Sequence, residues 1–376
     1  MTLRVGVPTE IKVDEFRVAL TPEGVRELDM HGIDVLVQSG AGAGSGLPDD
    51  DYRRAGAEVV DTAGEVWERA ELICKVKEPL KEEFAFFRDD LVLFTFLHLA
   101  AYPAVADALL DARMTGVAYE TVQLADGSLP LLAPMSEVAG RMSVQIGAHY
   151  LERHNGGRGV LLGGAPGVRP ARVVVFGAGN VGWNAAWMAA GLEAEVDLLD
   201  RNVERLRFID QIQMGRITTL ASNRGTAERV VAEADLVIGA VLVAGGRAPV
   251  VVTEEMVAGM RRGAVIVDVA IDQGGCVETS HETTHEDPVF ERHRVLHYAV
   301  GNMPGAVPNT STYALTNVTL PYVAELSRLG VVEAVGADPA LALGVNTAGG
   351  SVVNAAVAEA LDRPAADLGA ALGVPS

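Results

Sequence analysis

Residues 173–200 read VVVFGAGNVGWNAAWMAAGLEAEVDLLD, and this stretch decides the fold of the chain. An apolar β-branched run opens onto Gly177, Gly179 and Gly182, and a helix-compatible segment leads to a second apolar run that ends at Asp200. In such a unit the first glycine permits a tight turn, the second lets backbone approach a pyrophosphate, and the third lets helix pack on strand. The stretch therefore predicts a dinucleotide-binding domain. The alternative is an ordinary strand-to-helix turn of an α/β domain without a cofactor.

The acid at the end of this stretch indicates which dinucleotide is bound. The N–H groups at a helix start suit a phosphate, and an acid roughly 20 residues further on suits the ribose diol. A carboxylate at Asp200 disfavours a 2′-phosphate, so we expect NAD rather than NADP, although the neighbouring Arg201 weakens that preference slightly.

Composition limits the classes of partner. The chain has 376 residues, 49% of them apolar, and a formal net charge of −20, which argues against nucleic acid or an anionic membrane as a partner. The only cysteines are Cys74 and Cys276, and no signal-like or membrane-spanning run occurs, so we expect a soluble protein of the reducing cytoplasm.

Outside the glycine stretch, short apolar runs alternate with helical patterns, which is typical of a parallel sheet covered by helices. Residues 134–155 should form a long amphipathic helix, and residues 156–170 a loop. Pro321 is expected to kink or restart a helix over 308–328. Strands are expected at 4–8, 34–38, 71–77, 91–96, 117–122, 236–241, 265–270 and 295–300, and further helices at 21–31 and 104–112.

The glycine stretch lies in the middle of the chain, which favours an insertion. We expect an α/β protein of two Rossmann-like domains, with a dinucleotide-binding domain over residues 131–308 inserted into a discontinuous substrate domain of residues 1–130 and 309–376. A cleft between two such domains is the default ligand site.

Two basic residues of the expected substrate domain could hold an anionic substrate. Arg17 precedes the first expected helix, and its planar fork can grip a carboxylate through two parallel bonds. Lys77 ends the strand expected over 71–77, where it would share a face with Lys75 because side chains alternate. The alternatives are a solvated loop arginine and a surface lysine at a strand end.

Two further residues could transfer protons. His98 comes directly after a buried apolar strand, and Asp272 follows another apolar strand and precedes two glycines. The alternatives are a core histidine bonded to backbone and a turn-forming aspartate. No HExxH, CxxC, P-loop, GxSxG or EF-hand pattern occurs, so metal, phosphoryl-transfer and serine-hydrolase chemistries lack support.

Many ordered motifs resemble the alanine dehydrogenase family over nearly the full length. They are EIKVDEFRVALTP, KVKEP, LFTFLHLAA, AYETVQ, LPLLAPMSEVAGR, GGRGVLLGG, VVVFGAGNVG, DLVIGAV, VDVAIDQGGC and NMPGAVPNTSTYALTN. The resemblance implies reversible, NAD-dependent oxidative deamination of L-alanine to pyruvate and ammonia by a homohexamer.

The resemblance also implies roles for residues. Arg17 and Lys77 match the substrate-binding residues, and His98 and Asp272 match the catalytic pair. The expected cofactor contacts are Ser136, Gly177, Gly179, Asn180, Val181, Gly182, Asp200, Arg205, Ser222, Val241, Leu242, Val269, Asp272, Val300, Asn302 and Met303.

Two positions depart from the family pattern. Some members carry an arginine where His281 stands, which puts that cofactor contact in doubt. Some members have a metal-binding histidine near the helix that contains Glu325, but Leu329 occupies that place, so we predict no such metal site.

Three other functions are compatible with a chain of this kind. One is the NAD-binding subunit of a proton-translocating transhydrogenase, which predicts a longer chain or a membrane segment. Another is a catalytically silent NAD-binding sensor, which would lack one of the four polar residues above. The third is a dehydrogenase of another small L-amino acid, which only the resemblance ranks below alanine.

Overall fold

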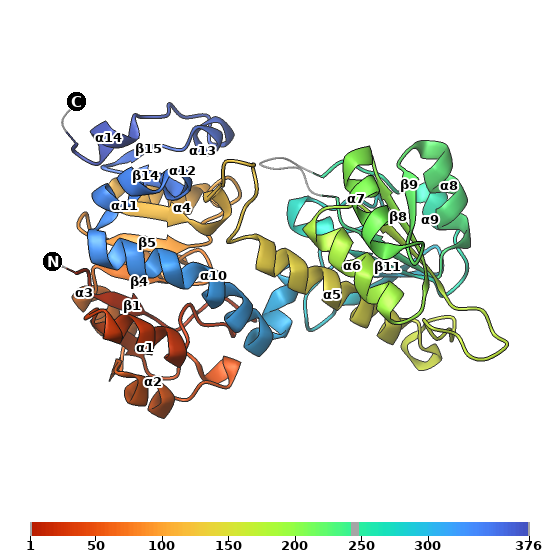
Figure 1. Ribbon diagram of the computed structural model, residues 1–376, viewed down its shortest axis with the longest axis horizontal. Helices are drawn as coiled ribbons and strands as arrows, with labels where there is room; N and C mark the ends of the chain where they lie inside the picture. The colour runs from red at the N-terminus through yellow and green to blue at the C-terminus, as the bar shows by residue number, and fades with distance from the viewer. Residues whose placement is uncertain (1, 242–247, 375–376) are drawn as a thin grey trace. The chain divides into compact units, whose positions relative to one another are not determined.

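The computed structural model describes residues 2–241 and 248–374. Two compact units divide the chain: unit 1 comprises Met1–Met135 and Gly305–Ser376, and unit 2 comprises Ser136–Pro304. In Figure 1 the red, orange and blue segments of unit 1 lie together, although they come from opposite ends of the chain. The boundaries expected from the sequence were at residues 130 and 308.

The sheet of unit 1 has eight strands in the order β15-β14-β6-β5-β4-β1-β2-β3. Pairing is parallel from β3 through β6, whereas β14 and β15 add an antiparallel edge. The strands are β1 Val5–Val7, β2 Val35–Gln38, β3 Glu58–Val60, β4 Leu72–Cys74, β5 Val92–Thr95, β6 Thr115–Ala118, β14 Val345–Ala348 and β15 Ser351–Val352.

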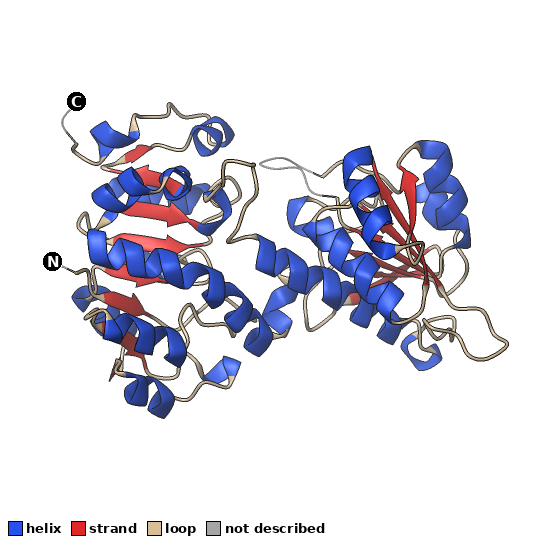
Figure 2. Ribbon diagram, viewed as in Figure 1, coloured by secondary structure: helices blue, strands red, loops and turns tan. Residues whose placement is uncertain are grey.

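Helices cover both faces of this sheet (Figure 2). The first helix begins as expected, with the Thr21 hydroxyl accepting from the Gly24 amide and Pro22 in the first turn. The helices are α1 Pro22–Met30, α2 Asp49–Ala55, α3 Ala63–Arg69, α4 Pro103–Asp111, α10 Pro308–Leu329, α11 Val331–Ala337, α12 Pro339–Gly344, α13 Ala355–Ala360 and α14 Leu368–Ala371.

The sheet of unit 2 has seven strands in the order β12-β13-β11-β10-β7-β8-β9, and β12 is its antiparallel edge. The strands are β7 Arg172–Phe176, β8 Glu195–Asp200, β9 Thr218–Ala221, β10 Leu236–Gly239, β11 Val265–Asp268, β12 Val289–Arg292 and β13 Val295–Tyr298. Its helices are α6 Asn180–Gly191, α7 Val203–Gln213, α8 Arg224–Glu233 and α9 Glu254–Ala258, and α5 Ala133–Tyr150 begins at the end of unit 1.

The predicted fold class is confirmed, with corrections at several elements. The strand expected over 71–77 ends at Cys74, and the one expected over 117–122 ends at Ala118, where the chain turns into the short helix Tyr119–Thr121. Pro321 lies inside α10, so the helix does not restart there. The β14–β15 hairpin was not expected, because the residues that form it follow two short helices without an alternating apolar pattern.

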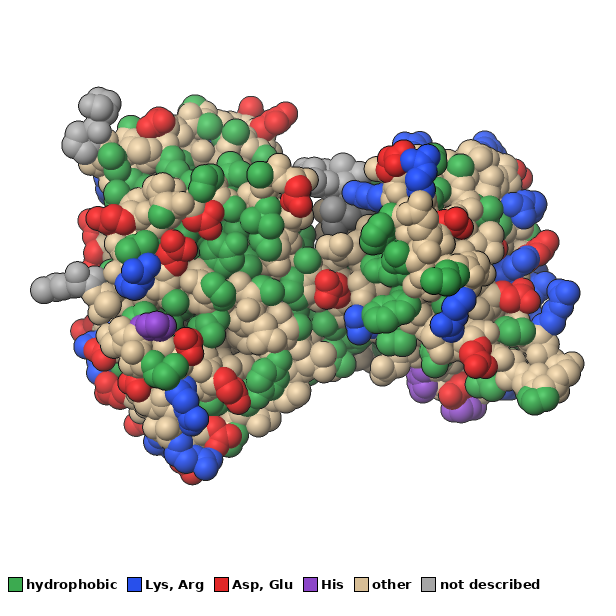
Figure 3. Space-filling model, in the orientation of Figure 1, with side chains coloured by type: hydrophobic (Ala, Val, Ile, Leu, Met, Phe, Trp, Pro, Cys, Tyr) green, Lys and Arg blue, Asp and Glu red, His purple; other side chains and the backbone are tan. Residues whose placement is uncertain are grey.

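Charged side chains of both signs lie on the surface. Figure 3 shows acidic and basic side chains interspersed on the visible faces of both units. None of the helices in the described ranges is long and apolar enough to cross a membrane.

Candidate active site

Three of the four proposed functional residues follow neighbouring strands of unit 1. Arg17 lies in the loop after β1, Lys77 follows β4, and His98 follows β5. In the order β3-β2-β1-β4-β5-β6, successive strands are added on one side of β1 as far as β3 and then on its other side from β4. Open α/β sheets bind ligands at the carboxyl ends of the strands beside such a topological switch point. The sheet therefore places these residues at the edge where a ligand is expected.

Arg17 is buried and is held by Glu15. The Glu15 carboxylate accepts from Arg17 Nε at 2.6 Å and from Nη2, and it also accepts from the Arg17 backbone N–H at 3.1 Å. Nη1 lies 3.0 Å from the Met135 sulfur. The two side chains are 2% and 0% exposed, so a solvated loop arginine is excluded.

Ion pairs join the loop after β1 to the loop after β4. Glu10 accepts from Lys75 at 2.9 Å and from the backbone N–H groups of Val76 and Lys77, and Lys12 pairs with the buried Glu78. Charged residues on either side of Lys77 are therefore bonded to residues that precede Arg17, so the two loops hold each other.

Lys75 and Lys77 have different surroundings, contrary to the expectation of a shared strand face. Lys75 is fully buried between Glu10 and Glu83, at 2.9 and 3.0 Å, whereas Lys77 is half-buried. Burial alone would lower the pKa of Lys75, but the two carboxylates outweigh it and raise that pKa, while burial raises the pKa of Glu10. Lys75 is thus a structural cation, which leaves Lys77 as the candidate for substrate.

His98 stands in a left-handed backbone conformation, with φ of 47°. The Glu120 carboxylate accepts from the Leu97 N–H at 3.2 Å and from the His98 N–H at 2.6 Å, and it lies 3.9 Å from His98 Nδ1. The imidazole stacks on Phe96 at 5.6 Å and is 34% exposed. A fully enclosed core histidine is therefore excluded, because about a third of the His98 side chain is exposed.

The glycine loop of unit 2 follows β7 and has the geometry that a pyrophosphate needs. Gly177 has φ of 100°, and a Cβ on Gly182 would lie 1.7 Å from the Gly177 carbonyl oxygen. A Cβ on Gly179 would meet only Arg205 Nη1, at 4.0 Å, so this position is open. Because Asn180 begins α6 directly afterwards, the loop and the helix start together fit a dinucleotide phosphate.

Asp200 ends β8 and faces the glycine loop. Its two oxygens accept from the Ala178 N–H at 2.6 Å and the Asn202 N–H at 2.7 Å. The carboxylate is half-buried, and its position beside the loop is the one at which a ribose diol is read.

Asp272 is exposed and lies in the short 3-10 helix Val269–Gln273, directly after β11. Its carboxylate accepts from the Asn302 N–H at 3.2 Å, which joins the segment after β11 to the segment after β13. Asp268, four residues earlier, is instead buried, and its carboxylate accepts from three backbone N–H groups. Asp272 is therefore the member of this pair that a ligand can reach.

Most of the remaining expected cofactor residues of unit 2 lie in segments that follow the carboxyl ends of its strands. Most follow β7, β8, β9, β10, β11 or β13, and Val300 and Met303 are buried whereas Arg205 is exposed. Leu242 lies outside the described residues. Those within the described residues are Ser136 at the start of α5, Asn180, Val181, Arg205, Ser222, Val241, Val269, Val300, Asn302 and Met303.

Two residues of the site were not assigned from the sequence, Glu15 and Glu120. Both lie inside quoted motifs, but neither had a role, because their partners depend on loop direction and on strand order. The alternation of charge in the segment around Glu15 is the only signal that could have suggested a paired arginine.

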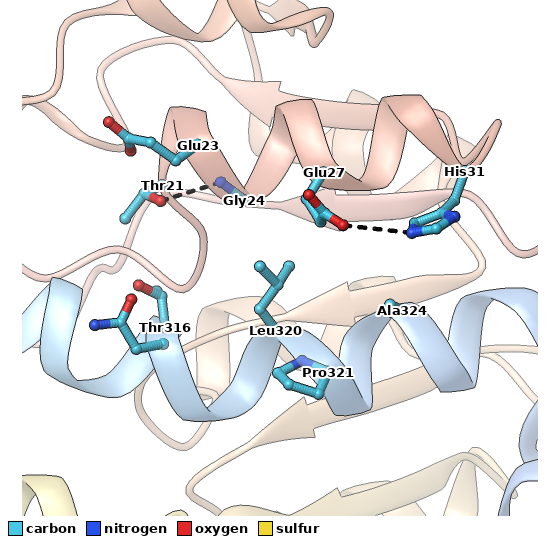
Figure 4. Close-up of a pocket in the computed structure, with 10 residues that line it drawn as sticks. Thr21, Glu23, Gly24, Glu27, His31, Thr316, Leu320, Pro321 and Ala324 are labelled. Atoms are coloured by element: carbon cyan, nitrogen blue, oxygen red, sulfur yellow. Dashed lines mark hydrogen bonds and ion pairs between the residues drawn. The ribbon is translucent and has the colours of Figure 1, made fainter.

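A surface groove and a stacked pair of rings involve none of the candidate residues. A groove between α1 and α10 is lined by Thr21, Glu23, Glu27, His31, Thr316 and Leu320 among others, but by none of the candidate residues (Figure 4). His281 stacks on Phe290, with ring centroids 3.8 Å apart. Within residues 2–241 and 248–374, no three His, Cys, Asp or Glu side chains are grouped as metal ligands.

The chain matches two models of one family. The model "Alanine dehydrogenase/PNT, N-terminal domain" matches residues 6–139, and "Alanine dehydrogenase/PNT, C-terminal domain" matches residues 143–355. The alanine dehydrogenase of Methanococcus maripaludis is 55% identical over 361 residues, which cover 96% of this chain and 97% of the relative.

Solved structures show the same similarity. An L-alanine dehydrogenase superposes with a TM-score of 0.93 at 52% identity, over 96% of this chain and 99% of the other. A transhydrogenase from Sinorhizobium meliloti superposes with a TM-score of 0.82 at 25% identity, over 93% of this chain and 99% of the other.

Proposed function

This chain belongs to the alanine dehydrogenase/PNT family, and we propose that it is an L-alanine dehydrogenase. The reaction converts L-alanine, NAD and water to pyruvate, ammonia and NADH, and it is reversible. The observation that carries the proposal is the arrangement of Arg17, Lys77 and His98 after neighbouring strands β1, β4 and β5.

We propose that Arg17 and Lys77 hold the substrate. The Arg17 guanidinium is buried, and a buried fork binds a carboxylate with direction as well as charge. Lys77 is half-buried in the loop that Glu10 holds, and there an ammonium can polarise the carbonyl oxygen of pyruvate. A cation at each end of this small molecule would fix its orientation.

His98 and Asp272 are the proposed proton-transfer groups. Both are accessible, and each is held by a hydrogen bond that involves a neighbouring segment: the His98 N–H donates to Glu120, and Asp272 accepts from the Asn302 N–H. When the alanine imine takes up water, a base must remove a proton from the water, and the leaving ammonia must then receive one. His98 and Asp272 are the residues to which we assign these transfers.

We propose that unit 2 holds NAD. Gly177, Gly179 and the amides at the start of α6 would receive the pyrophosphate, and Asp200 the adenosine ribose. NAD, when bound, supplies the acceptor for the hydride from the alanine Cα. The carboxylate of Asp200 would repel a 2′-phosphate, which supports NAD over NADP.

The proposal also includes an oligomeric state and a cellular compartment. The family resemblance supports a homohexamer, which light scattering of the purified protein would test. Both cysteines are free and buried, which supports the cytoplasm as the compartment.

The decisive experiment is NADH formation with a panel of L-amino acids at alkaline pH. We expect oxidation of alanine well above glycine, serine and valine. One methylene discriminates by only about 1–3 kcal/mol, so some activity on 2-aminobutyrate is compatible with the proposal. A better substrate than alanine would indicate a different amino-acid dehydrogenase. NADH binding without oxidation of any member would favour a transhydrogenase-like subunit or a sensor.

A further inference from the structure

We propose that Glu10 is a positioning residue, whose carboxylate fixes the turn after β4 and so sets where Lys77 stands relative to Arg17. The inference rests on the proposed function, because it needs Lys77 and Arg17 as the cations that hold the substrate. Glu10 is assigned no contact with substrate of its own, and it acts through the backbone of Lys77.

The Glu10 side chain takes the place of a strand beside this turn. β4 pairs with β1, and β1 ends at Val7, before the level of Val76. There the Glu10 Oε1 accepts from the Val76 N–H at 2.6 Å and from the Lys77 N–H at 3.4 Å. Buried backbone N–H groups need an acceptor. The carboxylate therefore supplies the acceptor that the ended strand no longer offers.

The opposite edge of the same turn is held by β5. The Lys75 N–H donates to the Phe94 carbonyl at 3.1 Å, and the Thr95 hydroxyl donates to the Lys77 carbonyl at 3.0 Å. Removing the Glu10 carboxylate should therefore leave the turn attached to β5. The turn would be loosened on the side of the loop after β1.

Lys75 fixes the direction of the Glu10 carboxylate. Its ammonium donates to Glu10 Oε2 at 2.9 Å and lies 3.0 Å from the Glu83 carboxylate. The side chains of these three residues are at most 5% exposed, so water competes little for the bonds. The cation also compensates the charge of a carboxylate that is costly to bury. Glu10 is thus held at one oxygen by Lys75 and binds the turn with the other.

Glu10 lies on the loop between β1 and α1, which also carries Arg17. Its bonds to the turn therefore set the spacing between the two cations proposed to hold one small substrate. A displacement of about 1 Å in such a site can cost about a hundredfold in rate. The Lys12–Glu78 ion pair joins the same two segments, but Lys12 is partly exposed and the pair is made by side chains.

The test compares Glu10→Ala with Glu83→Ala in steady-state pyruvate reduction at saturating NADH and ammonium. Glu83 is the matched control, because it also pairs with Lys75 and accepts from a backbone N–H, but that N–H belongs to Leu80, beyond the turn. We expect the KM for pyruvate to rise about tenfold or more in Glu10→Ala and to stay within about twofold of the wild type in Glu83→Ala.

The KM separates positioning from a merely structural role. If Glu10 only stabilised the fold, its removal would reduce the amount of active protein, and with it the apparent kcat, at an unchanged KM for pyruvate. An unchanged KM in a folded Glu10→Ala protein, or an equal rise in Glu83→Ala, would overturn the inference.

Hydrogen exchange tests the turn independently of activity. The amides of Val76 and Lys77 should exchange at least about tenfold faster in Glu10→Ala than in the wild type, because they lose their acceptor. In Glu83→Ala they should exchange at the wild-type rate. Unchanged exchange in Glu10→Ala would show that Glu10 does not hold the turn, which also overturns the inference.

Glu10→Asp serves if Glu10→Ala does not fold. It keeps a negative charge for Lys75, but its shorter side chain cannot reach both Lys75 and the turn. We expect its KM for pyruvate to rise about threefold to tenfold, and an unchanged KM would again contradict the role. If the wild-type protein reduces no pyruvate, the proposed function fails and this inference with it, whereas an active wild type with normal variants removes the role of Glu10 alone.

Discussion

Two carboxylates, Glu15 and Glu120, hold the side chains to which we assign the chemistry. Glu120 binds the backbone of a residue in a left-handed conformation, which costs roughly 1–3 kcal/mol for a side chain other than glycine. The two N–H groups that point at its carboxylate offset this strain. Glu120 thus fixes the direction of the His98 imidazole as well as lying near its Nδ1.

Removing the Glu120 side chain should loosen this turn. For Glu120→Ala we expect a loss of about 1–3 kcal/mol in the free energy of unfolding, from the unsatisfied N–H groups, and a fall in kcat of about tenfold to a hundredfold. Glu120→Gln keeps an oxygen for the N–H groups and should lose much less of both. Urea unfolding and steady-state alanine oxidation measure the two effects. Wild-type turnover in Glu120→Ala would show that His98 needs no such support.

The sequence could indicate the charged and titratable side chains of the candidate site, but not the carboxylates that hold them. Lys77 and His98 interrupt apolar patterns near expected strand ends, and Arg17 precedes the first expected helix; these positions are visible in a single chain. Glu120 meets His98 only because β5 and β6 are neighbours in the sheet. Lys75 could not be separated from Lys77, because the end of β4 at Cys74 breaks the alternation that related them.

The six parallel strands of each sheet are arranged in the same order. The order is β3-β2-β1-β4-β5-β6 in unit 1 and β9-β8-β7-β10-β11-β13 in unit 2. In both, the strand order reverses beside the first strand of the unit, β1 or β7. Alternating strands and helices predict such a sheet, since right-handed crossovers leave few other arrangements. The antiparallel edges β12, β14 and β15 were not predicted, because they are short and partly polar, and only the neighbouring strand determines that they pair.

The glycine loop between β7 and α6 allows two glycine roles to be separated. Gly182→Ala would place a Cβ 1.7 Å from the Gly177 oxygen, so we expect unit 2 to lose about 3 kcal/mol or more in stability. Gly179 has φ of −80° and ψ of −169°, which alanine adopts, and its Cβ would meet nothing closer than 4.0 Å.

Gly179→Ala should therefore fold normally but bind NAD more weakly, because the methyl group occupies the side on which a pyrophosphate approaches. Thermal unfolding and NADH fluorescence titration distinguish the two variants. Equal destabilisation by both, or wild-type NADH affinity in a folded Gly179→Ala protein, would contradict the assignment of the loop.

Each of the two units has its own buried apolar core. In unit 2 the fully buried His297 donates from Nδ1 to the Val295 carbonyl and lies 2.8 Å from the Thr279 hydroxyl. Burial lowers the pKa of His297 from 6.5 to about 4, and the nearby His281, His293 and Arg292 act in the same direction. The folded state therefore keeps this ring neutral where the unfolded chain protonates it.

The sign of the pH dependence follows from this difference. Between pH 6.5 and 4 the unfolded state binds more protons, so the free energy of unfolding of unit 2 falls as the pH falls, by about 2.5 kcal/mol at pH 4.5. The His297→Gln variant lacks this titrating group. Its free energy of unfolding should therefore fall by about 2.5 kcal/mol less than that of the wild type between pH 7.5 and 4.5. Hydrogen exchange of β10 and β11 at graded urea concentrations measures unit 2 separately from unit 1. His31→Gln, which alters an exposed histidine of unit 1, is the matched control and should leave these strands unchanged. If the free energy of unfolding of unit 2 depends on pH equally in His297→Gln and in the wild type, then other groups cause the acid sensitivity of unit 2.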